Sequence, residues 1–413
     1  MVPPAPPATL KRNPNRTVSL SREADGSAVV IKRFHAEGML ARLGDRGRAR
    51  REYEALARLA ARGVAVPAPV AWRRRGGAWE LVTEWIPRTR TLAELLATDA
   101  DSVARDLQLA RELGRLLAHL HACGLDHRDL HPGNVLIGEG GGVWLVDLGG
   151  ARFRRQITAP LMVRDLVSMC ASVREVLPSG FRSRCFLSWW RALDHTLRDR
   201  LPPRRAVIEG IEPRARTRRR AIVARQRARW TRESGVCRRS PTDGGVLLER
   251  REPARLGAEP MLVPVHSAEG WADSGRAGDH RLPCAVPLWW RAGEDAEGRV
   301  GLPAGTERVD RLRPTPGARL FFRAGHLLGT LHDRGLGLDE LRAEELWVAR
   351  DGRLLLGPAP HLEARERPRW PRLVGLPEPR TPRERAAFAS GFVNACRGTL
   401  RERAALRREL LDG

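Results

Sequence analysis

The sequence predicts an α+β fold in which a small antiparallel sheet precedes a helical lobe, and in which a second domain repeats this plan. Polar and apolar residues alternate over residues 17–34 and break at Asp25-Gly26, which indicates a β-hairpin. Apolar residues at helical spacing follow over residues 48–61. Residues 325–356 then repeat the pattern that starts at Gly114, at a constant offset of 211 and without a gap.

Further strands and helices complete the first domain. Residues 68–86 are typical of a second hairpin, with its turn at Gly76-Gly77. A short helix is expected from Thr91, because a threonine followed three residues later by a glutamate forms a capping box. Three longer helices are expected over residues 104–123, 161–177 and 181–198.

Composition divides the chain into four segments. They are a proline-rich, disordered tail (1–10), a first domain (11–205, with lobes 11–88 and 89–205), an arginine-rich linker (206–240) and a second domain (241–413). The arginine run at 214–220 is typical of a solvated linker, and contact with an anionic surface is the alternative.

The chain is strongly basic, with 73 basic and 49 acidic residues and a net charge of +24. This balance favours nucleic acid, an anionic membrane surface or phosphorylated substrates as partners. Only Lys11 and Lys32 are lysines, and such an arginine bias reflects codon drift, so no specific nucleic-acid partner is expected. Because the N-terminus lacks the pattern of a signal peptide and no apolar run is long enough to span a bilayer, the protein is expected in the cytoplasm.

One motif points to phosphoryl transfer. This reaction requires metal ions on the phosphates, a cation on the phosphates that are not transferred, and a base for the attacking hydroxyl. His127, Arg128, Asp129 and Asn134 form H-R-D-x-x-x-x-N, in which the aspartate faces the acceptor hydroxyl and the asparagine binds magnesium. Asp147 follows the next predicted strand and is placed to hold a second metal ion.

The cation is predicted at the end of the second strand. Lys32 ends Val-Val-Ile-Lys, which resembles the Val-Ala-Ile-Lys strand whose lysine pairs the α- and β-phosphates. Glu52 on the following helix is the best candidate for its partner, with Glu54 as the alternative. Lys32 as a solvated residue at the strand end is the other interpretation of this position. His119, His121 and His131 are expected to be core or loop histidines.

Over residues 9–198 the sequence resembles the protein kinase-like superfamily, and within it the bacterial lipopolysaccharide kinases of the Kdo/WaaP type. The segments that carry the resemblance are Val-Val-Ile-Lys-Arg-Phe, Arg-Glu-Tyr-Glu-Ala-Leu, Val-Pro-Ala-Pro-Val-Ala, Thr-Glu-Trp-Ile-Pro, His-Arg-Asp-Leu-His-Pro-Gly-Asn, Asp-Leu-Gly and Arg-Asp-Leu. The resemblance implies a two-lobed protein kinase-like fold that uses ATP and Mg²⁺. It implies these roles: Asp129 as catalytic base within the motif that also holds His127 and Arg128, Asn134 and Asp147 as metal ligands, Lys32 and Glu52 as the nucleotide-anchoring pair, and Asp165 as a brace for the catalytic loop.

The resemblance also implies the acceptor, a Kdo or heptose sugar of the lipopolysaccharide inner core. Such an acceptor suits a basic protein on the cytoplasmic face of the inner membrane. The sequence departs from the protein kinases in three ways. No G-x-G-x-x-G loop is present, so residues 19–27 would have to cover the phosphates; Leu148 replaces the phenylalanine of Asp-Phe-Gly; and only eighteen residues separate Asp147 from Asp165. The short exit favours a small or lipid-borne acceptor.

Other functions stay open at this point. The chain could be a small-molecule kinase of the aminoglycoside or choline type, a protein kinase, or an ATP-binding scaffold. At the offset of 211, Asp129, Asn134 and Asp147 become Glu340, Glu345 and Pro358, so the second domain is predicted to be a degenerate, pseudokinase-like copy. Its alternative is chance similarity, since Leu-Leu-x-x-Leu-His is common in amphipathic helices.

Overall fold

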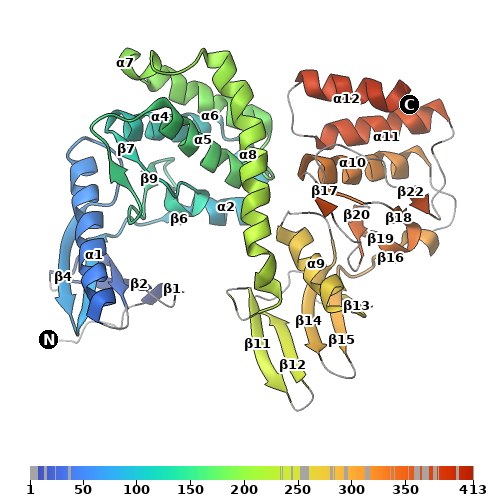
Figure 1. The fold of residues 1–413 in the computed structure, drawn as a ribbon, viewed down its shortest axis with the longest axis horizontal. Coiled ribbons are helices and arrows are strands. Elements are labelled where there is room, and N and C mark those ends of the chain that lie inside the picture. Colours follow the sequence, from blue (N-terminus) through green and yellow to red (C-terminus); the bar gives the residue numbers. More distant parts are fainter. Residues whose placement is uncertain are drawn as a thin grey trace. The chain divides into compact units, whose positions relative to one another are not determined.

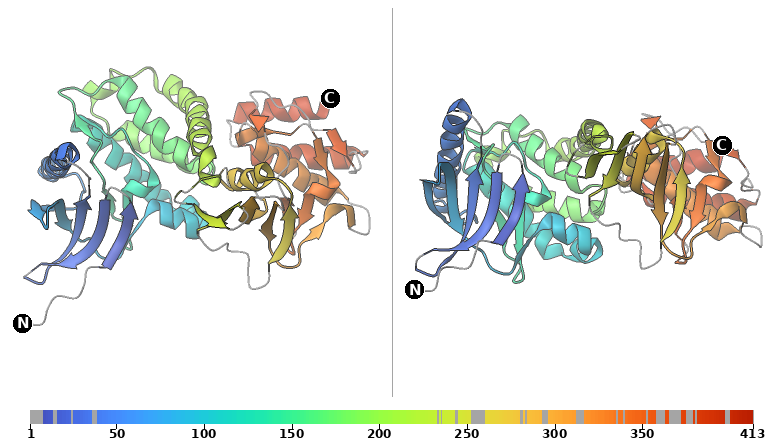
Figure 2. Two further views of the ribbon diagram at one scale, coloured as in Figure 1. Left: turned by 60° about the horizontal axis from the view of Figure 1, so that its bottom comes forward. Right: turned by 90° about the horizontal axis from the view of Figure 1, so that it is seen from below.

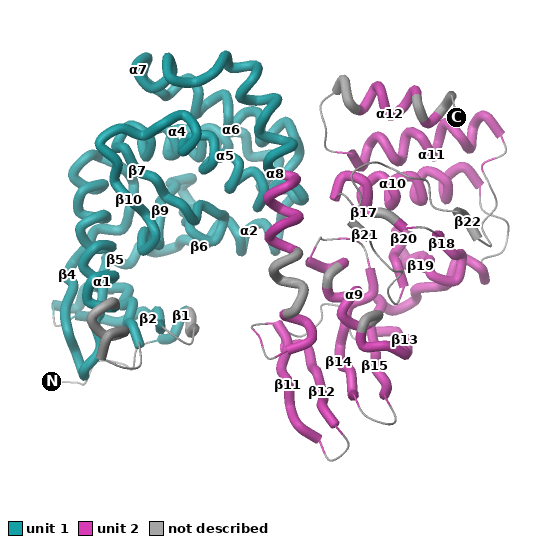
Figure 3. Tube along the Cα trace, in the orientation of Figure 1, with its two compact units in different colours: residues 1–215 teal, residues 216–413 magenta. Residues whose placement is uncertain are grey.

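The computed structural model divides the chain into two compact units, Met1–Ala215 and Arg216–Gly413 (Figure 3). It describes residues 8–13, 16–23, 25–35, 39–232, 234, 236–242, 245–251, 260–279, 282, 284–292, 296–311, 317–334, 336–338, 340–351, 353–357, 363–364, 372–374, 379, 381–396 and 400–412. Each unit has its own sheets and apolar core. No helix of these residues combines the length and the apolar character needed to cross a membrane.

A five-stranded antiparallel sheet begins the first unit, with strand order β1-β2-β3-β5-β4. The predicted hairpins are confirmed as the pairs β2–β3 and β4–β5. Their turns place Gly26, Gly76 and Gly77 at positive φ, which glycine adopts without strain. Helix α1 packs on β4 and β5, and Figure 2 shows it against one side of the sheet. The elements are β1 (Ala8–Asn13), β2 (Arg16–Arg22), β3 (Ala28–Phe34), α1 (Met39–Ala60), β4 (Pro69–Arg75) and β5 (Ala78–Glu84).

A helical lobe follows, with two small sheets at its base (Figure 1). The sheet β6-β8-β9 and the pair β7–β10 frame the segment that holds the H-R-D motif. The capping box at Thr91 and Glu94 forms as expected. The elements are β6 (Thr89–Thr91), α2 (Leu92–Thr98), α3 (Ala100–Arg105), α4 (Leu107–Ala122), β7 (Leu125–Asp126), η1 (Pro132–Asn134), β8 (Val135–Gly138), β9 (Val143–Leu145), β10 (Arg152–Phe153), α5 (Ala159–Val173), α6 (Ser179–Ala192) and α7 (His195–Arg198).

The structure differs from three expected boundaries. Residues 8–10, expected in the disordered tail, begin strand β1, and residues 1–7 of that tail lie outside the described part of the chain. Helix α1 begins at Met39, earlier than the apolar spacing indicates. The expected linker 206–240 contains most of helix α8 (Arg204–Gln226), whose first half buries Val207 and Ile211 in the core of the first unit. A mostly polar sequence concealed this helix, because few of its residues are apolar and buried, among them Val207, Ile211 and Val223.

Helices α4 and α6 approach closely at Gly114. A Cβ atom at this position would lie 2.4 Å from the carbonyl oxygen of Cys185 and 2.6 Å from the Cβ of Ser188. The Ser188 hydroxyl donates a hydrogen bond to the carbonyl oxygen of Arg111 at 2.7 Å, on the same side of the crossing. Only a residue without a side chain allows this distance between the two helices.

We expect Gly114→Ala to destabilise the protein by about 1–3 kcal/mol, because the added methyl group forces α4 and α6 apart. The matched control is Gly210→Ala in α8, where a Cβ would meet nothing within 4 Å. That control should stabilise by about 0.5–1 kcal/mol, the gain of alanine over glycine in a helix. Urea denaturation midpoints measure both changes. Equal effects of the two variants would contradict the close approach.

The second unit also opens with a five-stranded antiparallel sheet, in the order β11-β12-β14-β15-β13. Helix α9 packs on β13, β14 and β15, and helix α10 packs on α11. The elements are η2 (Arg227–Trp230), β11 (Cys237–Thr242), β12 (Gly245–Arg250), β13 (Met261–Val265), α9 (Ala268–Asp279), β14 (Val286–Ala292), β15 (Glu297–Leu302), β16 (Glu307–Arg308), η3 (Val309–Arg311), α10 (Ala318–Arg334), β17 (Leu336–Gly337), β18 (Glu340–Arg342), η4 (Ala343–Glu345), β19 (Leu346–Val348), β20 (Leu354–Leu356), β21 (Glu363–Ala364), β22 (Arg372–Val374), α11 (Pro382–Ala395) and α12 (Leu400–Asp412).

Six elements of the second unit begin 211 residues after elements of the first. The pairs are α4 and α10, β7 and β17, η1 and η4, β8 and β19, β9 and β20, and β10 and β21. Their strand pairing also corresponds: β16-β19-β20 repeats β6-β8-β9, and β17–β21 repeats β7–β10. Gly325 lies at the same offset from Gly114, and it too is a point of close helix contact, because its Cβ would lie 2.1 Å from the carbonyl oxygen of Phe388.

The two larger sheets differ in strand order. In the first unit, β3 pairs with β5, the second strand of the hairpin that follows the helix. In the second unit, β12 pairs with β14, the first strand of the corresponding hairpin, and β13 lies at the far edge. A second difference concerns helix α5, which has no described counterpart between β21 and α11, where parallel pairing of β22 with β18 occurs instead.

Candidate active site

Lys32 is held between two carboxylates in the second half of strand β3, which continues to Phe34. Its ammonium lies 2.8 and 2.7 Å from the two carboxylate oxygens of Glu52 on α1, and 2.8 Å from Oδ1 of Asp147. Lys32 is 7% exposed and Glu52 is 3% exposed. Glu54 instead pairs with Arg50 on the exposed side of α1 at 2.7 Å. A buried ammonium with two carboxylate partners is not a solvated strand-end residue.

Asp147 follows strand β9 in a left-handed conformation with φ of 61°. Its Oδ2 accepts a hydrogen bond from Arg16 at 2.8 Å, while its Oδ1 binds Lys32. Burial opposes ionisation, but the ammonium of Lys32 and the guanidinium of Arg16 outweigh it and hold the pKa of Asp147 well below its usual range. Asp147 is therefore a permanent anion, as a metal ligand must be.

Glu52 differs electrostatically from Asp147. Burial raises its pKa above the usual value, and the nearby Asp147 carboxylate adds to this increase, although the ammonium of Lys32 opposes it. Gly149 leaves room for this carboxylate, since a Cβ there would lie 3.3 Å from Oε2 of Glu52. Glu52 therefore depends on Lys32 for its charge.

Asp129 lies on the loop between β7 and η1, with its side chain 76% exposed. The side-chain amide of Asn134 donates to the carbonyl oxygen of Asp129 at 2.9 Å, which fixes the loop and turns the Asp129 carboxylate outward. The carbonyl oxygen of Asn134 in turn accepts the N–H of Val146 at 2.9 Å. These bonds join the Asp129 loop to the strand end that carries Asp147.

His131 is a loop histidine, as expected. Its Nδ1 accepts the backbone N–H of Gly133 at 3.0 Å, and its Nε2 lies 3.9 Å from Oδ2 of Asp129. His121 lies on α4, where its Nδ1 accepts the indole N–H of Trp189 at 2.9 Å. Both ring positions are explained by contacts with the protein.

Asp165 on helix α5 binds the backbone of the catalytic loop. Its Oδ2 accepts the N–H of His127 at 3.2 Å, and its Oδ1 accepts Arg164 at 3.0 Å. Burial alone would raise the pKa of Asp165. The hydrogen bonds from His121 and Arg164 lower it by more, so the pKa of Asp165 lies below its usual value. Arg128, next to this contact, adopts a left-handed φ of 68° and is exposed.

His127 has a buried ring, only 2% exposed, and neither ring nitrogen has a described hydrogen-bond partner. Burial lowers the pKa of His127, so the ring is neutral at physiological pH. The residue that precedes it, Asp126, is completely buried and accepts hydrogen bonds from Arg154 and Arg164. His127 therefore packs beneath the loop. Within the H-R-D motif, the carboxylate of Asp129 is the exposed group that can act as an acid or a base.

The structure brings in Arg16 and Asp126, which sequence reasoning missed. Strand pairing places Arg16 opposite Phe34 and Val18 opposite Lys32, so the start of β2 lies beside the half of β3 that carries Lys32. The β2–β3 turn lies at the other end of the sheet, and the expectation that residues 19–27 cover the phosphates stays a prediction. Recognising Ala8–Asn13 and Arg16–Arg22 as separate strands would have revealed Arg16.

These residues fit a nucleotide with magnesium. Magnesium takes few protein ligands, because water and phosphate oxygens complete its shell. The Asp147 carboxylate and the side-chain carbonyl of Asn134 are suitable donors, and Lys32 and Arg16 are cations that match phosphate charge. The described residues contain no cluster of three His, Cys, Asp or Glu side chains that could hold a metal ion.

The exit from the site is short. Strand β10 follows Asp147 after only a few residues and pairs with β7, and helix α5 then begins at Ala159. A protein kinase uses the corresponding stretch for an activation loop and a peptide platform. Residues 148–158 are therefore short compared with such a platform.

The strand order of the first sheet, helix α1 with its glutamate on Lys32, and the loop with Asp129 and Asn134 define a protein kinase-like fold. Residues 29–184 match the model of the lipopolysaccharide kinase (Kdo/WaaP) family, and all of these residues lie in the first unit. The sequence resemblance to this family is thus confirmed for that segment.

Proteins named 3-deoxy-D-manno-octulosonic acid kinase are similar to about a third of the chain. One from Xylella fastidiosa (strain M23) is 27% identical over 145 residues, covering 32% of this chain and 56% of that protein. One from Xanthomonas campestris pv. campestris (strain B100) is 32% identical over 131 residues, covering 29% and 51%. One from Stenotrophomonas maltophilia (strain K279a) is 30% identical over 150 residues, covering 33% and 58%. The chain therefore spans about half the length of these relatives.

In the second unit, the positions at the offset of 211 from Asp129, Asn134 and Asp147 carry Glu340, Glu345 and Pro358. Glu340, at the offset position of Asp129, lies 2.8 Å from Arg342. Glu345, at the position of Asn134, accepts the backbone N–H of Arg342 at 3.1 Å, and burial raises its pKa. Pro358, at the position of Asp147, lies outside the described residues.

Proposed function

We propose that the first unit transfers the γ-phosphate of ATP to a sugar hydroxyl of the lipopolysaccharide inner core, Kdo or heptose. The observation that carries this proposal is the ion cluster of Lys32, Glu52 and Asp147 beside the exposed carboxylate of Asp129, in a segment that matches the Kdo/WaaP family. The similar proteins named as 3-deoxy-D-manno-octulosonic acid kinases support a sugar acceptor.

Each residue has a role in this proposal. Magnesium-bound ATP supplies the phosphoryl group and neutralises its charge. Asn134 and Asp147 hold the metal, and Lys32, oriented by Glu52, binds the phosphates. The Asp129 carboxylate accepts the proton of the attacking sugar hydroxyl. Asp165 fixes the loop through the N–H of His127, so that the exposed carboxylate keeps its position.

Arg16 supplies the cation that replaces a glycine-rich loop. In the structure its guanidinium and the ammonium of Lys32 bind opposite oxygens of Asp147. With magnesium held by Asp147, Arg16 and Lys32 would be the cations available to the phosphates, and the planar guanidinium of Arg16 could bind two phosphate oxygens at once. The positive charge of Arg16 on strand β2 thus takes the place of the G-x-G-x-x-G loop.

The chain as a whole is proposed to act at the cytoplasmic face of the inner membrane, since its net charge of +24 attracts it to anionic headgroups. The second unit is proposed to be a degenerate kinase-like copy without catalytic groups. Six elements at one offset and the matching glycines Gly114 and Gly325 support common ancestry of the two helical lobes. The altered strand order of its sheet suggests a role other than nucleotide binding.

Label transfer from ATP tests the proposed acceptor. Purified full-length protein is incubated with γ-labelled ATP, magnesium and three acceptors in parallel: detergent-dispersed lipopolysaccharide precursors, an aminoglycoside with choline, and a generic protein substrate. We expect label in the lipid fraction alone. Label in the small molecules would favour the aminoglycoside or choline type, and intact ATP binding without transfer to any acceptor would favour a scaffold.

A further inference from the structure

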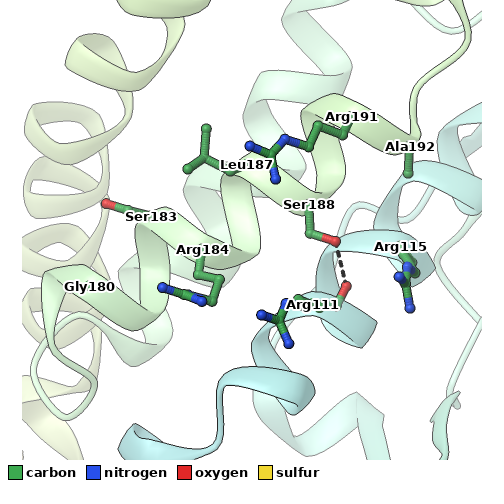
Figure 4. A pocket seen from close by; sticks show the side chains of 9 residues that line it. All are labelled: Arg111, Arg115, Gly180, Ser183, Arg184, Leu187, Ser188, Arg191 and Ala192. Carbon is green, nitrogen blue, oxygen red and sulfur yellow. Dashed lines mark hydrogen bonds between the residues drawn. The ribbon is translucent and has the colours of Figure 1, made fainter.

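Helices α4 and α6 form a basic groove away from the phosphotransfer cluster. The groove has a volume of about 600 Å³ and is lined by Arg111, Arg115, Gly180, Ser183, Arg184, Leu187, Ser188, Arg191 and Ala192. Figure 4 shows two arginines projecting from each helix. None of the lining residues carries a carboxylate, and none belongs to the site around Lys32 and Asp129.

The arginines of α6 are the most available of the four. Arg184 and Arg191 lie two helical turns apart on one face of α6, and no ion pair is described for either among the residues that the structure covers. On α4, Arg111 binds only the neutral amide of Gln108, and Arg115 pairs with Glu112 at 2.5 Å. The groove therefore carries uncompensated positive charge.

Another basic hollow of the first unit differs in this respect. It is lined by several arginines, but Arg62 donates to the carbonyl of Cys123 and Arg154 binds the buried carboxylate of Asp126. Those side chains stabilise the fold. In the α4–α6 groove, by contrast, the guanidinium groups of Arg184 and Arg191 point into an open surface hollow beside the half-buried Leu187.

We propose that this groove binds the phosphate headgroups of an anionic phospholipid surface and thereby holds the protein on the membrane. Guanidinium groups bind phosphate through paired hydrogen bonds, and an open groove without carboxylates accepts a headgroup without charge repulsion. Leu187 offers an apolar contact between the arginines. The choice of a membrane as occupant rests on the proposed lipid-borne acceptor, but binding itself requires neither ATP nor catalysis.

Vesicle cosedimentation tests the groove in the full-length protein. Vesicles of phosphatidylcholine are compared with vesicles that also contain phosphatidylglycerol. We expect binding only to the anionic vesicles. The double variant Arg184→Gln/Arg191→Gln should lose affinity roughly 30-fold, because each basic residue near an anionic surface contributes a similar share of the binding free energy. The matched control is Arg74→Gln/Arg75→Gln, which removes the same charge from the exposed β4–β5 turn and should change affinity far less.

Three outcomes would overturn the proposal. They are a failure of the wild type to bind anionic vesicles, an equal loss of affinity for them in the two double variants, and occupation of the groove by free inorganic phosphate as strong as that by the vesicle lipids. Thermal melts of both variants verify that they fold. The label-transfer assay in detergent separates this proposal from the proposed function, because transfer without vesicle binding contradicts the groove alone, and vesicle binding without transfer contradicts the kinase alone.

Discussion

Replacing Asp129 with asparagine should lower kcat for phosphoryl transfer by about 10²–10⁴-fold, because the amide cannot accept the proton of the attacking hydroxyl. The affinity for ATP should change little, since the Asp129 side chain is 76% exposed and is not among the described ion-pair partners of Lys32. The hydrogen bond from Asn134 reaches the backbone carbonyl of Asp129, so the substitution leaves the loop intact. Initial rates of label transfer and titration calorimetry with ATP measure the two quantities.

The control for this variant is Asp101→Asn, which removes another exposed carboxylate from the first turn of helix α3. Its rate should equal that of the wild type within a factor of about two. A full rate in Asp129→Asn, or an equal loss in both variants, would remove Asp129 from the role of catalytic base.

Replacing Lys32 with methionine should affect both activity and stability. The activity should fall by about 10²–10³-fold, the loss typical of one preorganised cationic or hydrogen-bonding contact to a transition state. The unfolding free energy should fall by about 3–5 kcal/mol, because the carboxylate of Glu52 would stay buried without its cation. Label transfer and urea denaturation record these effects separately.

A compensating substitution separates the two effects. In Lys32→Met/Glu52→Gln the buried charge is gone, so most of the lost stability should return while activity stays low.

Calorimetry should find one ATP bound per wild-type chain and none in either variant. Recovered activity in the double variant, or a second ATP bound in the wild type, would contradict the assignment of nucleotide binding to Lys32 and to the first unit.

Local patterns predicted much of the first unit. Alternation and glycine turns predict the hairpins β2–β3 and β4–β5, and the motif spacing predicts Asp129, Asn134 and Asp147 as the site residues, of which Asn134 contacts Asp129 in the structure. These features depend on neighbouring residues, which a single sequence records directly. Glu52, the preferred candidate, pairs with Lys32, and the alternative Glu54 pairs with Arg50 on the exposed side of α1.

Long-range placement could not be predicted in the same way. Arg16 reaches Asp147 across 131 positions of the sequence, and only the register of β1, β2 and β3 shows that the two meet. The strand order of the second sheet likewise depends on which edge each hairpin joins, a choice that apolar patterns leave open. Helix α8 was assigned to a linker because its arginines concealed the few apolar residues that dock it.

In the proposed reaction, the first unit moves phosphate from ATP to a lipid-borne sugar through Asp129. The most direct test is mass spectrometry of lipopolysaccharide precursors after incubation with ATP, magnesium and either the wild-type protein or Asp129→Asn. The proposed mechanism predicts one added phosphate, localised by fragmentation to a Kdo or heptose hydroxyl, with the wild type and none with the variant. An unchanged precursor with the wild type, or phosphate added equally by both proteins, would contradict it.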